Sequence, residues 1–366
     1  MSHDVIVIGG GAIGLSIARS LVRDRSVLLV ERDVAGRQSS WAAAGMLSPH
    51  SEAEADNALL QLGLTSLELY RDFVAELEDE TGIDVEYRAD GVLLLASTED
   101  EMEAIAKRAD WQQRRGLDVQ LLSPEQVRDL EPELTLDLRG ALHCAGDHQV
   151  RPRRLIDALK RSCELRGVEI AEGAPADEIL STGGSVVGAR VGGAVLNSKA
   201  IVVCAGAWAS QIQGLRPRLE MSPRKGQVLA LKMPGPVFKH LIRWKNLYFV
   251  PRNDFELVVG ATNEDRGFER ELTVAGLGGL LKGAQQMASV VGSYPVKDTW
   301  TGLRPLISDG LPAIGPAGVD GLVYALGHYR NGILLTPVTT ELVDSFVAGR
   351  SVPDYVDAFS PMRFGQ

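Results

Sequence analysis

The sequence predicts an α/β fold, α+β overall, in which two kinds of sheet carry two parts of the chain. An apolar run at residues 5–8 is followed at once by a glycine-rich turn and by apolar residues at helical spacing. A second apolar run at 26–30 ends in Glu31, and residues 222–262 alternate apolar and polar side chains. The first two patterns are typical of a Rossmann-like domain, and the third is typical of an antiparallel sheet in a second domain.

The glycine-rich turn, Gly9-Gly10-Gly11-Ala12-Ile13-Gly14, has the spacing of a dinucleotide-binding motif. Gly9 allows a tight turn, Gly11 lets the backbone approach a pyrophosphate, and Gly14 lets the helix pack closely on the strand. The helix N-terminus offers unpaired N–H groups and a partial positive charge to phosphates. Glu31 suits the ribose hydroxyls and disfavours a 2′-phosphate, so we predict a dinucleotide with an unphosphorylated ribose. The alternative is a glycine turn inside a purely structural βαβ unit.

The segment 32–46 distinguishes FAD from NAD. A simple NAD domain turns here into a helix and a third strand, whereas this segment is a run of small and hydroxyl residues. Small side chains let the backbone lie along an extended cofactor, and serine hydroxyls can donate to phosphates. For this segment alone, the alternative is a flexible alanine-rich linker or a short helix. We predict FAD, and the contacts expected here are Arg32, Ser39, Ser40, Ala44, Gly45 and Met46.

Composition and charge argue against several classes of protein. The 366 residues are 45% hydrophobic and 23% charged, which is typical of an ordinary soluble protein of two domains. The net charge of −10 argues against a nucleic-acid partner. A local basic run at 151–161 falls on a predicted helix, where we interpret it as a solvated face.

Cysteine, histidine and hydropathy patterns point to a cytoplasmic enzyme without a metal. The three cysteines and six histidines are scattered without metal-ligand spacing, so we predict reduced thiols and no metal site. The longest apolar stretches, such as 200–209, are about half a membrane span, and we expect no transmembrane segment. A strand that begins at Asp4 leaves no room for a signal peptide.

The remaining elements follow in order along the chain. Periodicity predicts helices over 58–79, 99–115, 150–167 and 333–347, a further helix beginning at Ser123, and strands over 91–96, 168–170, 200–205 and 322–326. Gly206 lies in a small-residue turn that suits close approach to the cofactor. A second strand–turn–helix near the C-terminus would aim another helix N-terminus at the cofactor, where its dipole would stabilise negative charge. The expected contacts there are His328, Tyr329, Arg330, Asn331, Gly332, Ile333 and Leu334.

Several motifs occur together in one order across nearly the whole chain. Besides the glycine turn and Glu31, they are Ser39–Met46 (SSWAAAGM), Leu247–Arg252 (LYFVPR), Val259–Thr262 (VGAT), Gly302–Pro305 (GLRP), Asp309–Gly315 (DGLPAIG) and Gly327–Leu335 (GHYRNGILL). With these motifs the chain resembles the FAD-dependent D-amino-acid oxidase superfamily, and within it the glycine oxidases of thiamine biosynthesis.

The resemblance implies a two-domain arrangement with a discontinuous cofactor domain. The FAD-binding domain would comprise residues 1–84, 148–218 and 302–366, and the substrate domain residues 85–147 and 219–301. Backbone at Ala176 would meet the adenine ring. No cysteine lies in 302–315 or 327–335, so we expect non-covalent FAD.

Arginine and tyrosine side chains are the expected substrate ligands. The planar fork of arginine makes two parallel hydrogen bonds to a carboxylate, and Arg304 matches the carboxylate-binding arginine of the family. Arg330 and Tyr248 are the second and third candidates. The expected reaction is hydride transfer from the amino acid to FAD, then hydrolysis of the imine to a keto acid and ammonia, with O₂ reduced to H₂O₂. No side chain is assigned as a general base.

Substrate identity stays open among relatives of the same fold. Asn246 and Asn263 stand where some relatives carry histidine and methionine, which puts polar amides near the expected pocket. The alternatives are a D-amino-acid, sarcosine or proline oxidase or dehydrogenase, a tRNA-modifying flavoenzyme, and a flavin-bearing subunit of a larger complex. We expect a small amino acid as substrate and a cytoplasmic homo-oligomer.

Overall fold

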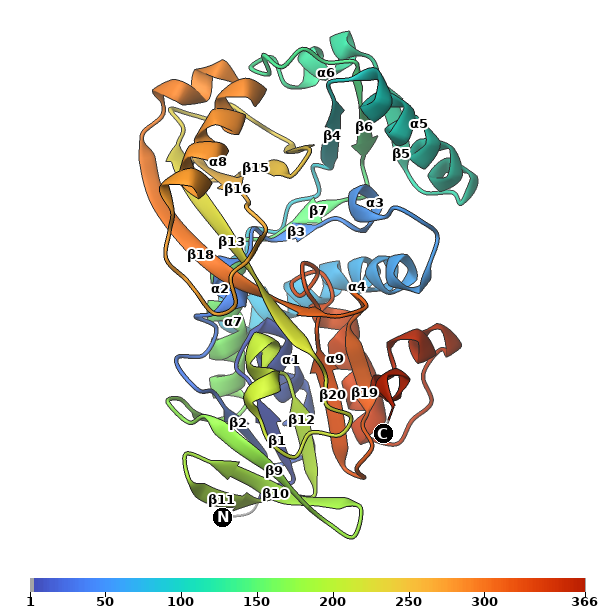
Figure 1. The fold of residues 1–366 in the computed structure, drawn as a ribbon, viewed down its shortest axis with the longest axis vertical. Helices are drawn as coiled ribbons and strands as arrows, with labels where there is room; N and C mark the ends of the chain where they lie inside the picture. Colours follow the sequence, from blue (N-terminus) through green and yellow to red (C-terminus); the bar gives the residue numbers. More distant parts are fainter. Residues whose placement is uncertain (1–2, 366) are drawn as a thin grey trace.

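The computed structural model describes residues 3–365 and contains a mainly parallel sheet in the lower half of Figure 1. All four residues of β1 and of β2 and the last three of β12 are buried, since both faces of the sheet are covered. β1 pairs in parallel with β2 on one side and β12 on the other, and only β19 runs antiparallel. In spatial order the strands are β19 (Ala313–Pro316), β20 (Leu322–Leu326), β12 (Ala200–Val203), β1 (Val5–Ile8), β2 (Val27–Val30) and β8 (Glu169–Ala171).

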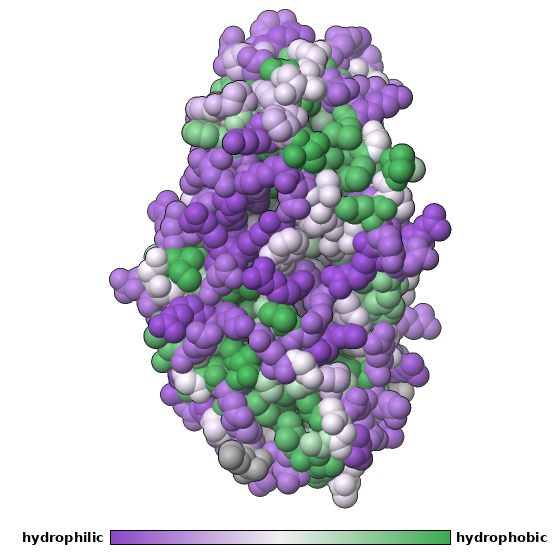
Figure 2. Space-filling model, turned by 90° about the vertical axis from the view of Figure 1, so that its left-hand side faces the viewer, coloured by the Kyte–Doolittle hydropathy of each residue, from purple (hydrophilic) through white to green (hydrophobic). Residues whose placement is uncertain are grey.

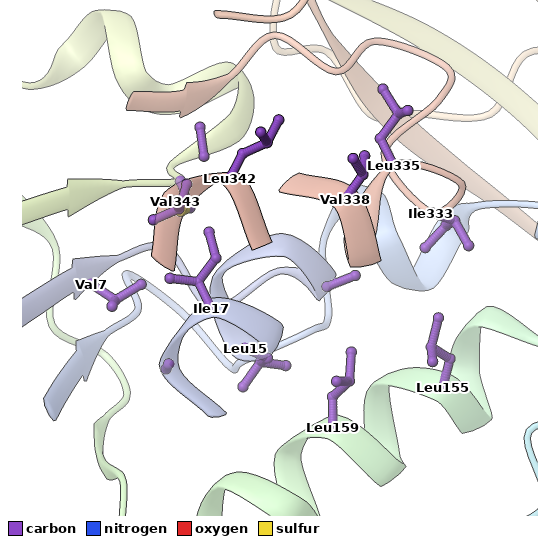
Figure 3. Packing of buried hydrophobic residues seen from close by; sticks show 14 of the residues in the cluster. Val7, Leu15, Ile17, Leu155, Leu159, Ile333, Leu335, Val338, Leu342 and Val343 are labelled. Carbon is purple, nitrogen blue, oxygen red and sulfur yellow. The ribbon is translucent and has the colours of Figure 1, made fainter. Parts of the chain in front are cut away.

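Helices cover one face of this sheet and bury a shared apolar core. Figure 3 shows Leu15 and Ile17 between Val343 on one side and Leu159 on the other, so three helices interlock there. The tight approach depends on Gly14, whose added Cβ would lie 1.9 Å from the Gly9 carbonyl oxygen. The helices are α1 (Ala12–Leu21), α4 (Ala58–Thr81), α7 (Pro152–Leu165) and α9 (Thr336–Val347).

A small antiparallel sheet covers the opposite face, and the sequence analysis did not predict it. Apolar residues such as Val186 and Ala189 join Ile6 and Ile8 in one buried cluster. The signal was the pairs Gly183-Gly184 and Gly192-Gly193, which all take the positive φ that two-residue hairpin turns require. Its strands are β9 (Ala176–Thr182), β10 (Ser185–Val191) and β11 (Ala194–Asn197).

The upper half of Figure 1 is built on a larger sheet that is antiparallel except for the pairing of β4 with β14. β13 and β18 are its longest strands, at 12 residues each, and they extend downward to the parallel sheet. Its strands are β17 (Glu264–Asp265), β13 (Met221–Lys232), β16 (Glu256–Gly260), β15 (Leu247–Pro251), β14 (Leu241–Trp244), β4 (Val92–Ala96), β6 (Gly140–Cys144) and β5 (Val119–Leu122), with β18 (Val296–Ile307) paired to β13.

Further helices and short elements complete the chain. The predicted start at Ser123 is confirmed, since Ser123 and Gln126 form a reciprocal capping box. The helices on the larger sheet are α5 (Glu99–Arg114), α6 (Pro124–Leu130) and α8 (Val274–Met287). The short elements are α2 (Ser39–Ala42), β3 (Met46–Leu47), α3 (Pro49–Glu52), β7 (His148–Gln149), and the 3₁₀ turns η1 (Gly206–Gln211), η2 (Ser289–Ser293), η3 (Asp354–Phe359) and η4 (Pro361–Phe364).

The predicted fold class, α/β and α+β overall, is confirmed, and one helix boundary is wrong. The helix predicted over 333–347 begins at Thr336, because residues 332–335 form turns and Pro337 lies in its first turn, where proline favours a helix start. The predicted domain boundary at 301/302 lies inside β18. The outer ends of the predicted cofactor domain, residues 1, 2 and 366, lie outside the described residues.

The basic run at 151–161 is only partly the solvated face that we predicted. Arg154 and Arg161 are exposed, as expected, but Arg151 and Arg153 are half-buried. Arg151 donates to Glu86, and Arg153 lies against two aromatic rings. The error arises because helical periodicity identifies the apolar face and does not show what packs against the other faces.

Figure 2 shows hydrophilic residues across the middle of one face, with apolar residues in separate groups above and below. Among residues 3–365, no helix is long and apolar enough to cross a membrane, and no three His, Cys, Asp or Glu side chains cluster as metal ligands. Cys144, Cys163 and Cys204 are free and buried.

Candidate active site

A cavity of about 460 Å³ lies where the two large sheets meet. Its lining comes from the turn after β1, the end of β2, the segment around α2, the turn after β12, strands β13, β15 and β18, and the turn after β20. In Figure 1, β13 and β18 cross the middle of the molecule between the upper and the lower sheet. The volume is in the range of small-molecule and cofactor sites.

The glycine turn forms one end of the cavity. Gly9 has a φ of 107°, and an added Cβ would lie 2.5 Å from the Cys204 carbonyl oxygen, so only glycine fits. Gly11 is the N-cap of α1 and provides no side-chain cap, while Ala12 N–H donates to Ser40 Oγ at 3.0 Å. Gly9, Gly11, Ala12 and Ile13 line the cavity, whereas Gly14 serves the packing of α1 on β1. The other N–H groups of the first turn of α1 suit a phosphate group.

Glu31 lies at the end of β2 and is held by backbone. Its carboxylate accepts from Gly10 N–H at 2.7 Å and from Asp33 N–H at 3.0 Å. Burial raises the pKa of the Glu31 carboxyl, and the two N–H donors oppose that change. A carboxylate oxygen accepts more than one hydrogen bond, so Glu31 retains capacity for ribose hydroxyls on its cavity side.

Arg32 and Trp208 form the adjoining wall. The Arg32 guanidinium lies 5.1 Å from the centroid of the Trp208 ring and donates to Gln211 Oε1 at 3.3 Å. Ala176 and Gly206 line the same cavity. The wall therefore offers flat aromatic and backbone surface next to the predicted ribose site. Sequence reasoning did not assign Trp208 or Gln211; the signal was their place in and after the small-residue turn at Gly206.

The segment around α2 lines the central part of the cavity. Residues Ser39–Ala42 of this segment are helical, so the short-helix alternative is correct for them. The segment nevertheless borders the cavity. Ser39 Oγ donates to the Leu303 carbonyl, so that hydroxyl proton is already engaged, while Ser40 retains its own. Ala44, Gly45 and Met46 follow along the lining.

Two polar atoms of this lining have no partner among residues 3–365. Gln38 and Ser48 are residues of the lining, and their buried atoms Gln38 Oε1 and Ser48 Oγ have no hydrogen-bond partner within the described chain. Buried polar atoms are usually satisfied, so these two point to a polar ligand. Together with the first turn of α1 and Glu31, this donor and acceptor set fits an extended dinucleotide such as FAD.

The turn after β20 closes the other side of the cavity. His328, Tyr329, Arg330, Asn331, Gly332 and Ile333 line it, whereas Leu334 is buried in the core, where its carbonyl accepts from Ser66 Oγ. Burial lowers the pKa of His328 to about 4, so the imidazole is neutral, and its Nε2 lies 3.0 Å from Thr339 Oγ1. The orientation of the α9 N-terminus toward the cofactor stays a prediction.

Arg304 lies flat over a glycine. A Cβ added to Gly226 would lie 2.5 Å from Arg304 Nη2, so the glycine leaves room for the guanidinium. Arg304 Nη1 donates to the Thr262 carbonyl at 3.1 Å. No carboxylate of residues 3–365 is within 4.0 Å of the Arg304 guanidinium, which leaves charge and N–H donors for a ligand.

Tyr248 and Arg330 border the same part of the cavity. The Tyr248 ring lies over Gly260, where an added Cβ would lie 2.3 Å from the phenol oxygen. Burial raises the pKa of Tyr248, and the nearby charges of Arg304 and Arg330 oppose that change. The three predicted substrate residues therefore lie close enough to interact electrostatically. The phenol is thus a neutral hydroxyl that can donate to an anion.

Polar side chains to which the sequence analysis assigned no role also border the cavity. Asn246 and Asn263 both line it, and Asn263 Nδ2 donates to Tyr329 Oη at 3.2 Å. Glu52 lines it as well, and its Oε1 lies 3.6 Å from Arg330 Nη2. Sequence reasoning missed Glu52, because one glutamate in the acidic segment 52–56 resembles any exposed acid.

Comparisons with known proteins agree on one family. The family described as "FAD dependent oxidoreductase" (DAO) matches residues 4–345. The "Bifunctional protein ThiO/ThiG" of Trichormus variabilis is 34% identical over 370 residues, which cover 100% of this chain and 55% of that protein. The glycine oxidase of Geobacillus kaustophilus is 33% identical over 367 residues, covering 99% and 97% of the two chains. The chain spans about half the length of the bifunctional relatives that it matches.

Solved structures give the same result. The crystal structure of the Geobacillus kaustophilus glycine oxidase matches with a TM-score of 0.94 and 32% identity over 98% of both chains. The crystal structure of an iminodiacetate oxidase from Chelativorans sp. matches with a TM-score of 0.86 and 26% identity over 98% of both chains.

Proposed function

The chain belongs to the DAO family of FAD dependent oxidoreductases, and we propose that it is an oxidase of glycine or another small amino acid. Arg304 carries the proposal. It is an arginine of the cavity lining that a glycine accommodates and that no carboxylate of residues 3–365 neutralises. Such a guanidinium suits the carboxylate of an amino acid. The glycine oxidase relatives, which match this chain over nearly their whole length, support the same substrate class.

The residues of the site would orient the substrate rather than react with it. The Arg304 guanidinium would bind the substrate carboxylate through two parallel N–H donors. The neutral Tyr248 hydroxyl would donate a further hydrogen bond to the same carboxylate. Asn246 and Asn263 border the cavity, where their amides can accept from the substrate amine. We assign no general base, since the amine form of the substrate needs none.

Bound FAD would supply the acceptor for the hydride from the substrate Cα. The amino acid then also loses the proton on nitrogen and becomes an imine, which water hydrolyses to a keto acid and ammonia. We propose O₂ as the final acceptor of the two electrons, giving H₂O₂. Orientation of Cα by Arg304 and Tyr248 is the contribution of this chain to the rate.

The cofactor residues proposed from the sequence would hold FAD in a defined direction. The turn at Gly11 and Ala12 would bind the pyrophosphate, Glu31 the adenosine ribose, and the turn at His328 the flavin side. Cys204 borders the cavity, but burial raises the pKa of its thiol, so the reactive thiolate is not formed. We therefore propose non-covalent FAD, which acid precipitation should release from the protein.

The biological setting is proposed from the same relatives. We propose that the reaction serves thiamine biosynthesis in the cytoplasm, as the similarity to the ThiO/ThiG proteins suggests, and that the chain acts as a homo-oligomer. Sarcosine, D-amino acids and proline are the alternative substrates within the same fold.

The test is anaerobic reduction of the bound flavin by a panel of amino acids. We expect glycine or another small amino acid to bleach the yellow colour of the purified protein, and readmission of air to restore it with formation of H₂O₂. A preparation that takes up no FAD, or a bound flavin that no amino acid of the panel bleaches, would contradict the proposal.

A further inference from the structure

Glu52 contributes a carboxylate to the lining of the cavity, close to the guanidinium of Arg330. It is the last residue of α3, it borders the cavity, and its side chain is only 20% exposed. Its Oε1 lies 3.6 Å from Arg330 Nη2 and 3.6 Å from Arg243 Nη2. One carboxylate oxygen therefore faces two guanidinium groups that come from distant parts of the chain.

Hydrogen bonds to α3 fix the position of the Arg243 side chain. Its Nη1 donates to the Ser51 carbonyl at 3.0 Å and to Ser51 Oγ at 3.2 Å. Arg108 Nη1 donates to the same carbonyl at 2.8 Å. Burial and the charge of Arg243 lower the pKa of Arg108, and Glu54 and Glu52 oppose that change. Three positive groups thus surround the end of α3.

Arg304 and Arg330 differ in what faces them. Arg304 has a backbone carbonyl as partner and no carboxylate of residues 3–365 within 4.0 Å, whereas Arg330 has Glu52. Both arginines line the same cavity. Among the arginines of the lining, Arg304 therefore offers its full charge to a ligand, whereas Glu52 offsets part of the charge of Arg330.

We propose that Glu52 determines the charge of the substrate that this site accepts, by restricting it to amines with a single carboxylate. A ligand with one carboxylate binds at Arg304 and leaves Glu52 undisturbed. A second anionic group would reach toward Arg330, where it meets the Glu52 carboxylate instead of a free guanidinium group. Like charges repel, so a second anion binds less favourably there than beside an unpaired arginine.

Removal of the Glu52 charge should invert this preference, provided that the proposed oxidase function is correct. The matched substrates are sarcosine (N-methylglycine) and iminodiacetate (N-carboxymethylglycine), both secondary amines of glycine that differ by one carboxylate. We expect Glu52→Gln to raise kcat/KM for iminodiacetate relative to sarcosine by about tenfold or more. The gain should shrink at high ionic strength, since salt screens charge.

Glu54→Gln is the matched control. It removes the same charge from an exposed residue two positions away that does not border the cavity. The ratio of kcat/KM for the two amines should stay that of the unaltered protein. If Glu52→Gln changed both amines by the same factor, Glu52 would have a merely structural role and the proposal would be wrong.

An equilibrium measurement separates this proposal from the oxidase function. Acetate and malonate carry one and two carboxylates and have no amine, and their binding to the FAD-loaded protein can be followed by flavin absorbance. We expect Glu52→Gln to strengthen malonate binding relative to acetate by about tenfold. An unchanged ratio would overturn the role of Glu52. A protein that oxidises no amine but shows the changed ratio would overturn only the oxidase function.

Discussion

Arg304 owes its place in the site to a residue without a side chain. Gly226 lies on the neighbouring strand β13, and any Cβ there would contact the guanidinium. The same arrangement recurs at Tyr248, which lies over Gly260 on the paired strand β16. At two points, therefore, a glycine makes space for a longer polar side chain of the partner strand.

Replacement of Arg304 tests the carboxylate site. Hydrogen bonds to charged groups contribute about 1.5–3 kcal/mol each, so loss of the two proposed Arg304 bonds in Arg304→Ala should lower kcat/KM for the amino acid by about 100-fold or more, mainly through KM. Arg304→Lys should fall between, because lysine retains the charge and loses the planar fork. The measurement is steady-state oxidation with the FAD content matched among variants.

Arg224 offers a matched control for Arg304. It is the residue opposite Arg304 on β13, and its guanidinium pairs with Asp265 rather than bordering the cavity. Arg224→Ala should leave KM within about twofold of the parent, as surface ion pairs contribute little. Equal losses in the two alanine variants would remove Arg304 from the carboxylate site.

At the scale of elements, three segments meet at one cation. The Arg153 guanidinium of α7 lies 3.6 Å from the ring centroid of Trp41 in α2 and 4.6 Å from that of Trp300 in β18. Trp300 Nε1 donates to the Ala42 carbonyl at 3.0 Å, and Ala42 lines the cavity. This cluster of Arg153, Trp41 and Trp300 thus fixes the short helix that borders the cofactor site.

Loss of the Arg153 guanidinium should loosen α2 and weaken cofactor binding. Each cation–π contact contributes about 0.5–2 kcal/mol, so Arg153→Ala should raise the Kd for FAD about tenfold. Titration of the apoprotein with FAD, followed by quenching of flavin fluorescence, measures this directly.

Arg161 is the control on the same helix. Its side chain is exposed, and within residues 3–365 its one ion pair is with Glu164, one turn away. Arg161→Ala should bind FAD as the unaltered protein does. If Arg153→Ala also bound FAD normally, the cluster would contribute to packing alone.

At the scale of the whole molecule, the cavity is shared by the two sheets. The glycine turn and the ends of β2, β12 and β20 form one side, while β13, β15 and β18 form the other. The long strands β13 and β18 join both halves in Figure 1. A ligand that fills the cavity therefore contacts both halves at once and stabilises their arrangement.

Removal of FAD should lower the thermal stability of the protein. A ligand present at one hundred times its Kd adds about 2.7 kcal/mol to the free energy of unfolding, which for a chain of this length corresponds to about 3–4 °C in the midpoint. Thermal scans of the apoprotein with and without FAD measure the difference. ADP should restore part of the stability, because it fills only the side at Gly11 and Glu31. An unchanged midpoint with saturating FAD would contradict a shared site.

Local patterns predicted much of the fold. The predicted helices over 58–79, 99–115 and 150–167 agree with α4, α5 and α7 to within two residues at each end. Their periodicity is set by which face is buried, and that is written in neighbouring residues. The start of α9 was predicted three residues too early, because the apolar residues 333–335 pack into the core as turns.

Side-chain partners were far less predictable. Arg153 was interpreted as part of a solvated face, yet it contacts Trp41 and Trp300, which lie 112 residues before it and 147 residues after it in the chain. Glu52 was not singled out at all, since the arginines nearest to it in sequence are Arg37 and Arg71. Contacts of this kind depend on how distant segments are folded together.

The sequence by itself determined the glycine turn, the acid at the end of the second strand, the fold class and the cofactor class, because each depends on backbone geometry and spacing over short stretches. Only the tertiary structure decided which charges face one another: Arg304 over Gly226 without a carboxylate, and Arg330 and Arg243 beside Glu52. The reason is physical. Electrostatic interactions follow distance in space, and residues 52, 243, 304 and 330 become neighbours only when both sheets are in place.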